Sequence, residues 1–340
     1  MLRLLPRLAS ADNVGFSFGG LMLIFAPTQS KDFAQAVASH LGVELARSEE
    51  REYEGGEHKI RPQQVVRGEE VFVIQSLSGD EHATANDKLC RLLFFIGALK
   101  DAGASRVTAC LPFLAYSRKD RRTQPGDPVI NRYVATLFEA MRTDRVVVLD
   151  VHNEAAFDNA FRCESLRLDA IEPFAEFLSG NIQVRDAVVA SPDIGGVKRA
   201  QRFRDVLAGK LGTDVGFAFM EKRRERGVVS GQILTGEVQD RDLVIFDDMI
   251  SSGTTILRAA LAAKRAGARR VIVMATHPAL QPEAVRLWQD DAIESVIVSD
   301  SIALPAAFRT FPSKKLQICS LAPLFAQTIS MLARPNSGAR

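Results

Sequence analysis

A chain of 340 residues is longer than one typical hydrophobic core supports, so the sequence predicts two domains. An apolar content of 46% and a charged content of 25% are ordinary for a globular protein. The formal net charge is +2, from 43 basic and 41 acidic residues, and this balance gives no reason to expect a nucleic-acid partner.

The cysteines and the apolar runs exclude further classes of protein. The four cysteines show no paired spacing, so neither a disulfide framework nor a zinc knuckle is expected. A reduced, cytoplasmic protein fits this pattern. No apolar run reaches the roughly 18–20 residues that span a bilayer, so we expect no membrane association.

The first 21 residues, MLRLLPRLASADNVGFSFGGL, have some features of a targeting segment, but Pro6 and Arg7 interrupt the apolar run. The first strand-like run spans residues 21–25 and contains Met22. We therefore interpret residues 1–21 as an upstream extension or a misassigned start rather than as a signal peptide.

Apolar, β-rich runs then alternate with helical patterns. The predicted strands span residues 21–26, 71–75, 107–111, 146–149, 187–190, 244–246, 271–275 and 295–298. Helical patterns such as residues 88–102 and 255–266 lie between most of them. Strands that are apolar on both faces and separated by helices indicate a mainly parallel sheet covered on both sides. The predicted fold class is therefore α/β.

An internal repeat divides this pattern into two halves. Residues 98–109 (ALKDAGASRVTA) match residues 262–273 (AAKRAGARRVIV) at a fixed offset of 164. In both copies a helix ends at a glycine, Gly103 or Gly267, and a strand follows. We therefore expect two similar α/β halves that meet near residue 165.

Residues 245–255 read IFDDMISSGTT and lead from a strand through a turn into a helix. The start of a helix presents free N–H groups and the positive end of its dipole. Gly253 allows close backbone approach, and hydroxyl donors are added by Ser251, Ser252, Thr254 and Thr255. This arrangement predicts a cup for a monophosphate. It is not a nucleoside-triphosphate loop, because the G-x-x-x-x-G-K-[ST] pattern is absent from it.

Two carboxylates precede this cup. Asp247 and Asp248 can accept hydrogen bonds from vicinal hydroxyls or hold Mg²⁺ through water. A pentose 5-phosphate carries a diol and a phosphate at about the required separation. The whole stretch is therefore interpreted as a pentose-phosphate site. The alternative is a capped helix preceded by two surface acids.

The loop resembles the phosphoribosyl-diphosphate signature of type I phosphoribosyltransferases, and five further motifs narrow the resemblance to the ribose-phosphate diphosphokinase family. These motifs are YEGGE (53–57), LPFLAYSRKDRR (111–122), LDVHNEAAFDNAF (149–161), SPDIGGVKRA (191–200) and EKRRER (221–226). The resemblance covers about residues 22–330. It implies an ATP-side phosphoribosyltransferase-like domain over residues 22–165 and a ribose 5-phosphate-side domain over residues 166–340.

The resemblance also implies a reaction, in which the diphosphoryl group of ATP is transferred to the 1-hydroxyl of ribose 5-phosphate with Mg²⁺ as cofactor. Lys222 and Arg224 match cations that close over the transferring group, and such cations can stabilise charge that develops in the transition state. His152 matches a residue near the ATP phosphates and at a Mg²⁺ site, and Asp193 matches a second Mg²⁺ ligand. Imidazole is an unusual Mg²⁺ ligand, so the location of His152 is the firmer expectation.

The remaining implied contacts are with ATP. Arg118 and Lys119 match phosphate- or adenine-binding positions, although the family usually has glutamine at the second of them. Tyr53 and Glu57 match a loop that holds adenine from a neighbouring subunit, so a homo-oligomer, a dimer or a hexamer, is expected. The family's aspartate in that loop is Gly55 here, which predicts looser nucleotide selectivity. Ser251 replaces another common aspartate but keeps a donor.

Two other functions compete with this interpretation. A non-catalytic regulatory homologue would bind nucleotide without turnover, but such proteins typically lose the loop cations or the acid pair, and both are present here. A phosphoribosyltransferase that consumes the diphosphate would usually have one domain. The duplicated half that carries the YEGGE and LDVH motifs, residues 22–165, argues against it.

Overall fold

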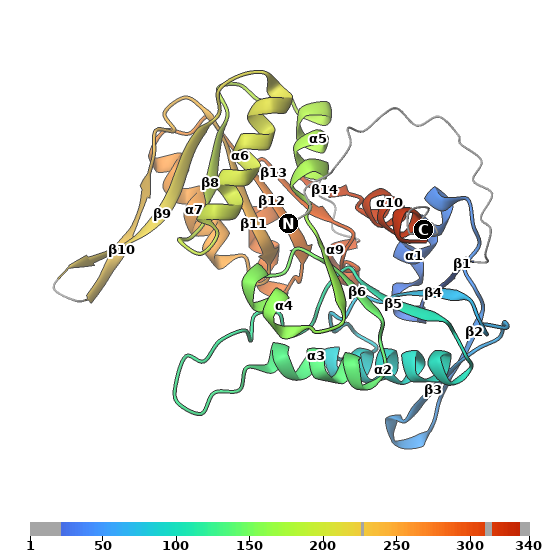
Figure 1. Cartoon of the computed structure of the whole chain (residues 1–340). Coiled ribbons are helices and arrows are strands. Elements are labelled where there is room, and N and C mark those ends of the chain that lie inside the picture. Colours follow the sequence, from blue (N-terminus) through green and yellow to red (C-terminus); the bar gives the residue numbers. More distant parts are fainter. Residues whose placement is uncertain (1–21, 226–227, 310–314, 334–340) are drawn as a thin grey trace, which may run out of the picture.

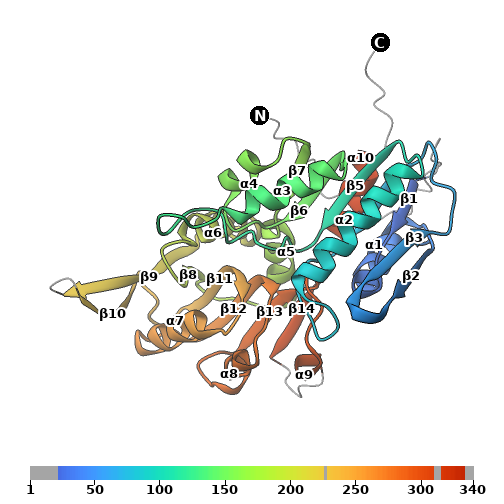
Figure 2. The same ribbon diagram turned by 90° about the horizontal axis from the view of Figure 1, so that it is seen from below.

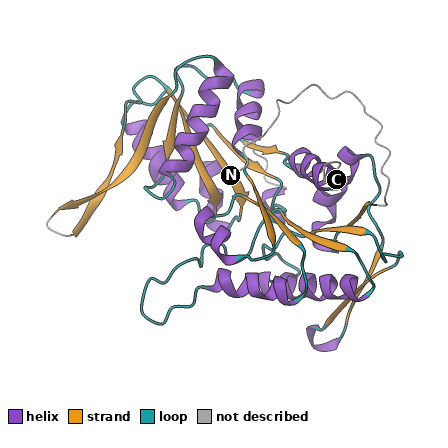
Figure 3. Cartoon of the chain, in the orientation of Figure 1, coloured by secondary structure: helices purple, strands orange, loops and turns teal. Residues whose placement is uncertain are grey.

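The computed structural model describes residues 22–225, 228–309 and 315–333, and for residues 222–225 and 228–232 the backbone alone. It contains two mainly parallel β-sheets, one from each half of the chain, with helices packed on their faces (Figures 1 and 3). The predicted α/β class with two similar halves is confirmed. Residues 1–21 lie outside the described part of the chain.

The first sheet has the strand order β1-β4-β5-β6-β7, and each neighbouring pair is parallel. Its strands are β1 (Met22–Phe25), β4 (Glu70–Ile74), β5 (Arg106–Leu111), β6 (Arg145–Leu149) and β7 (Glu164–Leu168). The helices of this half are α1 (Lys31–Leu41), α2 (Ala85–Asp101), α3 (Ile130–Ala140) and α4 (Glu154–Ala160). A separate antiparallel hairpin consists of β2 (Ser48–Glu52) and β3 (His58–Pro62).

The second sheet has the order β10-β9-β8-β11-β12-β13-β14 and is parallel except for the β9–β10 pair. Its strands are β8 (Val188–Ser191), β9 (Gly216–Glu225), β10 (Val228–Thr235), β11 (Asp242–Ile250), β12 (Arg270–Pro278), β13 (Ser295–Ser299) and β14 (Leu316–Cys319). The helices are α5 (Ile171–Asn181), α6 (Val197–Leu211), α7 (Thr254–Arg265), α8 (Arg286–Gln289), α9 (Ala306–Arg309) and α10 (Ala322–Leu332). In Figure 1 the β9–β10 hairpin projects away from the body of the protein.

The internal repeat corresponds to one structural unit in each half, β4-α2-β5 in the first and β11-α7-β12 in the second. The glycines that follow the two helices adopt the left-handed conformation, with φ of 90° at Gly103 and 86° at Gly267. A Cβ on Gly267 would lie 2.0 Å from the side-chain oxygen of Gln239, which could move aside, so the left-handed conformation is the reason for glycine there.

One buried apolar cluster joins the two halves. It includes Phe174, Phe203 and Phe246, and the rings of the last two stack with centroids 4.2 Å apart. The final helix, α10, lies beside α1 of the first half (Figure 1) and packs Phe325 against Phe33. The sequence-based division at residue 165 falls within β7. We propose that the linker between the two domains follows β7.

Five further helices cover the opposite faces of the sheets. The buried side chains of α2 and α3 form a core with the first sheet, and those of α7, α8 and α9 form a core with the second (Figure 2). Helix α2 begins with a capping box, in which Thr84 and Asp87 each bond the other's backbone N–H. None of the described helices is both long and apolar enough to cross a membrane.

A buried ion cluster at the opposite end of the second sheet from the cavity described below gives a stability prediction. The fully buried Asp242 carboxylate contacts Arg269 and Arg270, each at 2.6 Å, and accepts the Arg185 N–H at 2.8 Å. We expect Asp242→Asn to lower the free energy of unfolding by about 3 kcal/mol, at the low end for a broken buried pair because the guanidinium groups are partly exposed. Urea unfolding at neutral pH measures this change.

The pH dependence of that change follows from the pKa of Asp242. Burial alone would raise this pKa, but hydrogen bonds from Arg270 and Arg269 lower it below its usual value. A lowered pKa means that the stabilisation is complete above the unfolded-state pKa, about 4, and is lost as the pH falls below it. The wild type and Asp242→Asn should therefore converge in acid. A difference that stays constant down to pH 3 would contradict the ion-pair account.

Candidate active site

A cavity of about 1010 Å³ opens where strands of both sheets reach their carboxyl ends. This edge is where ligands bind in parallel α/β sheets. The first half contributes the segments after β5 and β6, and the second half contributes those after β8 and β11. The predicted site residues that line the cavity are Arg118, His152, Asp193, Asp247, Asp248, Ser251, Ser252, Gly253, Thr254 and Thr255.

The predicted phosphate cup is the turn between β11 and α7. Gly253 precedes the first residue of α7 and has φ of 73°, and a Cβ there would lie 2.9 Å from Leu287 Cδ1. Glycine is therefore needed for both conformation and space. The hydroxyls of Ser252 and Thr254 lie 3.1 Å apart and both face this turn. The cup thus combines hydroxyl groups with the N-terminus of a twelve-residue helix. Both supply hydrogen-bond donors, which a phosphate needs.

The two acids before the cup have different environments. Asp248 is buried, and its Oδ2 atom lies 2.7 Å from His152 Nδ1 and 3.6 Å from Arg199 Nη1. Burial opposes ionisation, but the His152 hydrogen bond and the Arg199 charge hold the pKa of Asp248 well below its usual range. The pKa of Asp247 is raised well above its usual range, mainly by desolvation and secondly by the charge of Asp248. Asp248 is therefore the stably charged member of the pair.

Asp193 lies close to Asp247 above the start of α6. Its Oδ1 atom accepts the Gly196 N–H at 3.0 Å. A Cβ on Gly196 would lie 3.7 Å from Asp247 Oδ1 and 3.9 Å from Asp193 Oδ1, so both carboxylates converge on this glycine. The same Cβ would meet Ser191 Oγ at 2.8 Å, which explains why the position holds glycine. Acids from β8 and β11 thus share one wall of the cavity.

Basic side chains complete the cavity, and sequence reasoning missed most of them. Arg199 contacts Asp248 and also donates to the Val151 carbonyl at 3.3 Å, so it bridges the two halves. The SPDIGGVKRA motif contains Arg199 on the first turn of α6, and that position was the available signal. Other cavity cations without a sequence-based assignment are Arg121, Lys198 and Arg202.

Only one of the two predicted ATP-binding residues after β5 lines the cavity. Arg118 lines it, with Nη1 3.7 Å from Met249 Sδ. Lys119 is exposed and does not line it; its backbone N–H bonds the Tyr116 carbonyl in a tight turn.

The predicted adenine-loop residues lie outside the cavity of their own chain. Tyr53 and Glu57 flank a short 3₁₀ turn between β2 and β3, and both are exposed. The Arg51 guanidinium lies 4.9 Å from the centroid of the Tyr53 ring. In Figure 1 this hairpin lies at the far side of the first half from the β9–β10 hairpin.

The predicted loop cations belong to β9. Met220 of this strand lines the cavity, and the backbones of Lys222 and Arg224 pair with Gln232 and Val229 of β10. The side chains of Lys222 and Arg224 lie outside the described part of the structure.

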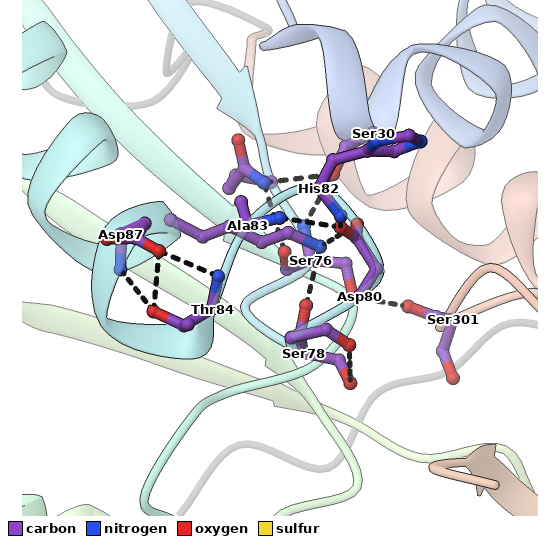
Figure 4. Close-up of polar contacts among 12 residues, drawn as sticks. Ser30, Ser76, Ser78, Asp80, His82, Ala83, Thr84, Asp87 and Ser301 are labelled. Carbon is purple, nitrogen blue, oxygen red and sulfur yellow. Dashed lines mark hydrogen bonds and ion pairs between the residues drawn. The ribbon is translucent and has the colours of Figure 1, made fainter. Parts of the chain in front are cut away.

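The corresponding loop of the first half is closed by its own side chains (Figure 4). Asp80 Oδ1 accepts the N–H groups of His82 and Ala83 at 2.8 and 2.9 Å. Its Oδ2 atom pairs with the buried Lys88 ammonium at 2.5 Å. An internal carboxylate therefore takes the backbone donors and the cation that a bound anion would otherwise need at this loop.

Within the described residues, no three His, Cys, Asp or Glu side chains are grouped as a metal cage. Mg²⁺ usually takes one or two protein carboxylates and completes its shell with water and substrate phosphates. Asp193, with one oxygen free of the Gly196 bond, and the partly exposed His152 ring fit such a partial site.

Comparisons with known proteins agree with this geometry. The model for the N-terminal domain of ribose phosphate pyrophosphokinase matches residues 22–141, and that for the phosphoribosyl synthetase-associated domain matches residues 230–339. The ribose-phosphate pyrophosphokinase of Helicobacter hepaticus is 33% identical over 92% of this chain and 96% of the relative. That of Thermotoga maritima is 32% identical over 94% and 97%. The crystal structure of Mycobacterium smegmatis phosphoribosylpyrophosphate synthetase has a TM-score of 0.81 and 30% identity over 92% of this chain and 98% of that one.

The two tandem phosphoribosyltransferase-like domains, together with the relatives that the chain matches, define a transferase of the nucleotide-biosynthesis class. Identity above 30% across nearly the full length of the curated relatives then determines the family. The chain belongs to the ribose-phosphate pyrophosphokinases.

Proposed function

We propose that this enzyme transfers the diphosphoryl group of ATP to O1 of ribose 5-phosphate, giving 5-phosphoribosyl 1-diphosphate and AMP. The observation that carries the proposal is the common cavity, in which the phosphate cup and acids of the second half face His152 of the first. In the transfer, O1 bonds to the β-phosphorus and the bond from that phosphorus to the AMP oxygen breaks. Such a step needs positioning and charge neutralisation more than covalent chemistry.

The residues divide these tasks. The cup at residues 251–255 holds the 5-phosphate, while Asp247 and Asp248 accept hydrogen bonds from the ribose hydroxyls. His152 and Arg118 bind the ATP phosphates from the opposite wall, and Lys119 gives a weaker contact from its exposed position. Ribose and triphosphate are thereby held side by side, which is the main source of rate enhancement in a reaction of this kind.

The cofactor in this proposal is Mg²⁺, held by Asp193 and His152 together with substrate oxygens, and it offsets the charge of the triphosphate. Asp193 is kept in place by the Gly196 N–H. His152 is kept in place by Asp248, which leaves Nε2 directed away from that bond.

The assembly in this proposal is a homo-oligomer, a dimer or a hexamer. Tyr53 and Glu57 would bind adenine in the cavity of a neighbouring chain, and their exposed position outside their own cavity supports this. A cytoplasmic location is supported by the four free thiols, Cys90, Cys110, Cys163 and Cys319.

The direct test is AMP release from ATP, followed by HPLC with Mg²⁺ present. We expect AMP to form only when ribose 5-phosphate is added, in equimolar amount with 5-phosphoribosyl 1-diphosphate. No AMP under these conditions would favour a homologue that binds nucleotide without turnover.

Nucleotide selectivity gives a further prediction. Gly55 replaces an acceptor for the adenine amino group, and a lost hydrogen bond of about 1.4 kcal/mol corresponds to about tenfold in selectivity. We therefore expect the preference for ATP over GTP or CTP to be about tenfold smaller than in Gly55→Asp. The control is Gly55→Asp, since a Cβ at this position meets no atom within 4 Å and aspartate tolerates its φ of 82° better than most residues. Strict ATP dependence of the wild type would contradict the prediction.

A further inference from the structure

Asp150, which follows β6, is held by the second half of the chain through two different groups. Its carboxylate accepts a hydrogen bond from the Thr276 hydroxyl, and its carbonyl oxygen lies 3.2 Å from His277 Nε2. Asp150 also has φ of 39°, a left-handed conformation that residues other than glycine rarely adopt. Such a conformation persists only where the surroundings fix it, and here Thr276 and His277 of β12 do so.

The next two residues are also bonded to the second half. The Val151 carbonyl accepts a hydrogen bond from Arg199 Nη2 at 3.3 Å, and His152 Nδ1 lies 2.7 Å from Asp248 Oδ2. Residues 150–152 thus form a continuous seam between the halves, and we use that name for them below. Its first residue is bonded to buried Thr276, and its last residue carries the imidazole that faces the cavity.

The base of the seam is firmly anchored. His277 Nδ1 lies 2.9 Å from Ser301 Oγ, and the Phe113 ring packs edge-on against the His277 ring with centroids 5.1 Å apart. Burial lowers the pKa of His277 to about 4, so the ring is neutral and its Nε2–H donates to Asp150. The Ser301 carbonyl accepts the Ser76 hydroxyl at 2.7 Å, which ties β4 to the same point (Figure 4). Thr276 is therefore held in place through the contacts of its neighbour His277.

Asp150 does not itself line the cavity. It is packed within the protein, where burial raises its pKa to about 6. Its effect on bound ligands must therefore pass through His152, two residues further along the seam.

We propose that Thr276 is a positioning residue for the reaction: its hydroxyl holds Asp150, and the seam in turn sets the His152 imidazole against Asp248. This inference rests on the proposed function, in which His152 binds the ATP phosphates. Thr276 does not touch the substrates. It fixes the geometry of a group that does.

The kinetic test uses Thr276→Val, which removes the hydroxyl and keeps the shape. We expect kcat to fall about tenfold, because a small displacement of a binding group is costly. The KM for ribose 5-phosphate should change less than kcat, since the cup at residues 251–255 lies outside the seam and only Asp248 of the ribose-binding residues contacts it. Thr276→Ser keeps the hydroxyl and should recover most of the lost kcat. The matched control is Thr108→Val on β5, where a fully buried hydroxyl has no hydrogen-bond partner among the described residues.

A second readout does not depend on turnover. The ¹⁵N signals of the His152 ring, assigned by comparison with His152→Gln, report whether Nδ1 keeps its bond to Asp248. We expect these signals to move in Thr276→Val and to stay unchanged in Thr276→Ser and Thr108→Val. If Thr276→Val does not fold, Thr276→Ala removes the same hydroxyl with less steric demand and is measured in its place.

The possible outcomes test the proposed function and the positioning role of Thr276 separately. An inactive wild type would refute the proposed function, while the ring signals would still decide whether Thr276 positions His152. The inference is overturned if the His152 signals and kcat of the valine variant match those of Thr108→Val. It is also overturned if Thr276→Ser loses as much kcat as Thr276→Val, because the hydroxyl would then be irrelevant.

Discussion

Replacing Asp248 with asparagine is expected to lower kcat/KM for ribose 5-phosphate by about 10²- to 10³-fold. The carboxylate is buried and bonded to His152 and Arg199, and in our account it also accepts a ribose hydroxyl. Hydrogen bonds to a charged group contribute about 1.5–3 kcal/mol each, and two such bonds correspond to this loss. Asparagine keeps the shape but removes the charge that all these donors share. Steady-state kinetics with ribose 5-phosphate as the varied substrate measures the change.

The matched control is Asp247→Asn, at the adjacent position. Its carboxyl group has a raised pKa and therefore takes a proton more readily than Asp248 does. A neutral amide resembles that state more closely, so the loss should be clearly smaller. An equal or larger loss for Asp247→Asn would contradict the assignment of Asp248 as the charged acceptor.

The second large effect is expected at Lys222. Lys222→Ala should lower kcat by about 10²- to 10³-fold, because a cation that acts mainly on the transferring diphosphoryl group stabilises the transition state more than the bound substrates. The KM for ribose 5-phosphate should change little. The assignment rests on the EKRRER motif and on the backbone of β9, which leads from Met220 at the cavity wall to residue 222.

The control for Lys222 is Arg223→Ala, which removes one positive charge from the same run. The motif assigns no role to Arg223, so kcat should stay within about threefold of the wild type, the range of general charge effects. A Lys222→Ala variant whose whole loss appeared in KM would remove Lys222 from the catalytic group.

The sheets were largely predictable from the sequence because their strands are parallel and buried on both faces. Such strands appear as short apolar runs, and β6 (RVVVL) is an example. Four of the strands that were not predicted lack this pattern. β2 (SEERE) and β3 (HKIRP) form a separate polar hairpin, and β7 (ESLRL) and β14 (LQIC) are short edge strands of their sheets. Their pairing is decided by neighbours distant in the sequence.

The candidate site was predictable where its residues are contiguous. The phosphate cup lies within one stretch of eleven residues, 245–255, and its chemistry can be inferred from that stretch alone. The His152–Asp248 pair joins residues 96 positions apart, and no local pattern encodes it. Arg199 and Thr276 were not predicted for the same reason, because their contacts cross the boundary between the halves. Asp80 was not predicted either, because an acid in a loop gives no sign that it closes that loop.

In the proposed function, ribose 5-phosphate binds at the end of β11, with its phosphate in the cup and its hydroxyls toward Asp247 and Asp248. A crystal structure of the protein soaked with ribose 5-phosphate tests this most directly. We predict phosphate density against the N–H and hydroxyl groups of residues 251–255, with the sugar hydroxyls facing the two acids. Density for the sugar phosphate at the first-half loop around Asp80, with the cup empty, would contradict the account.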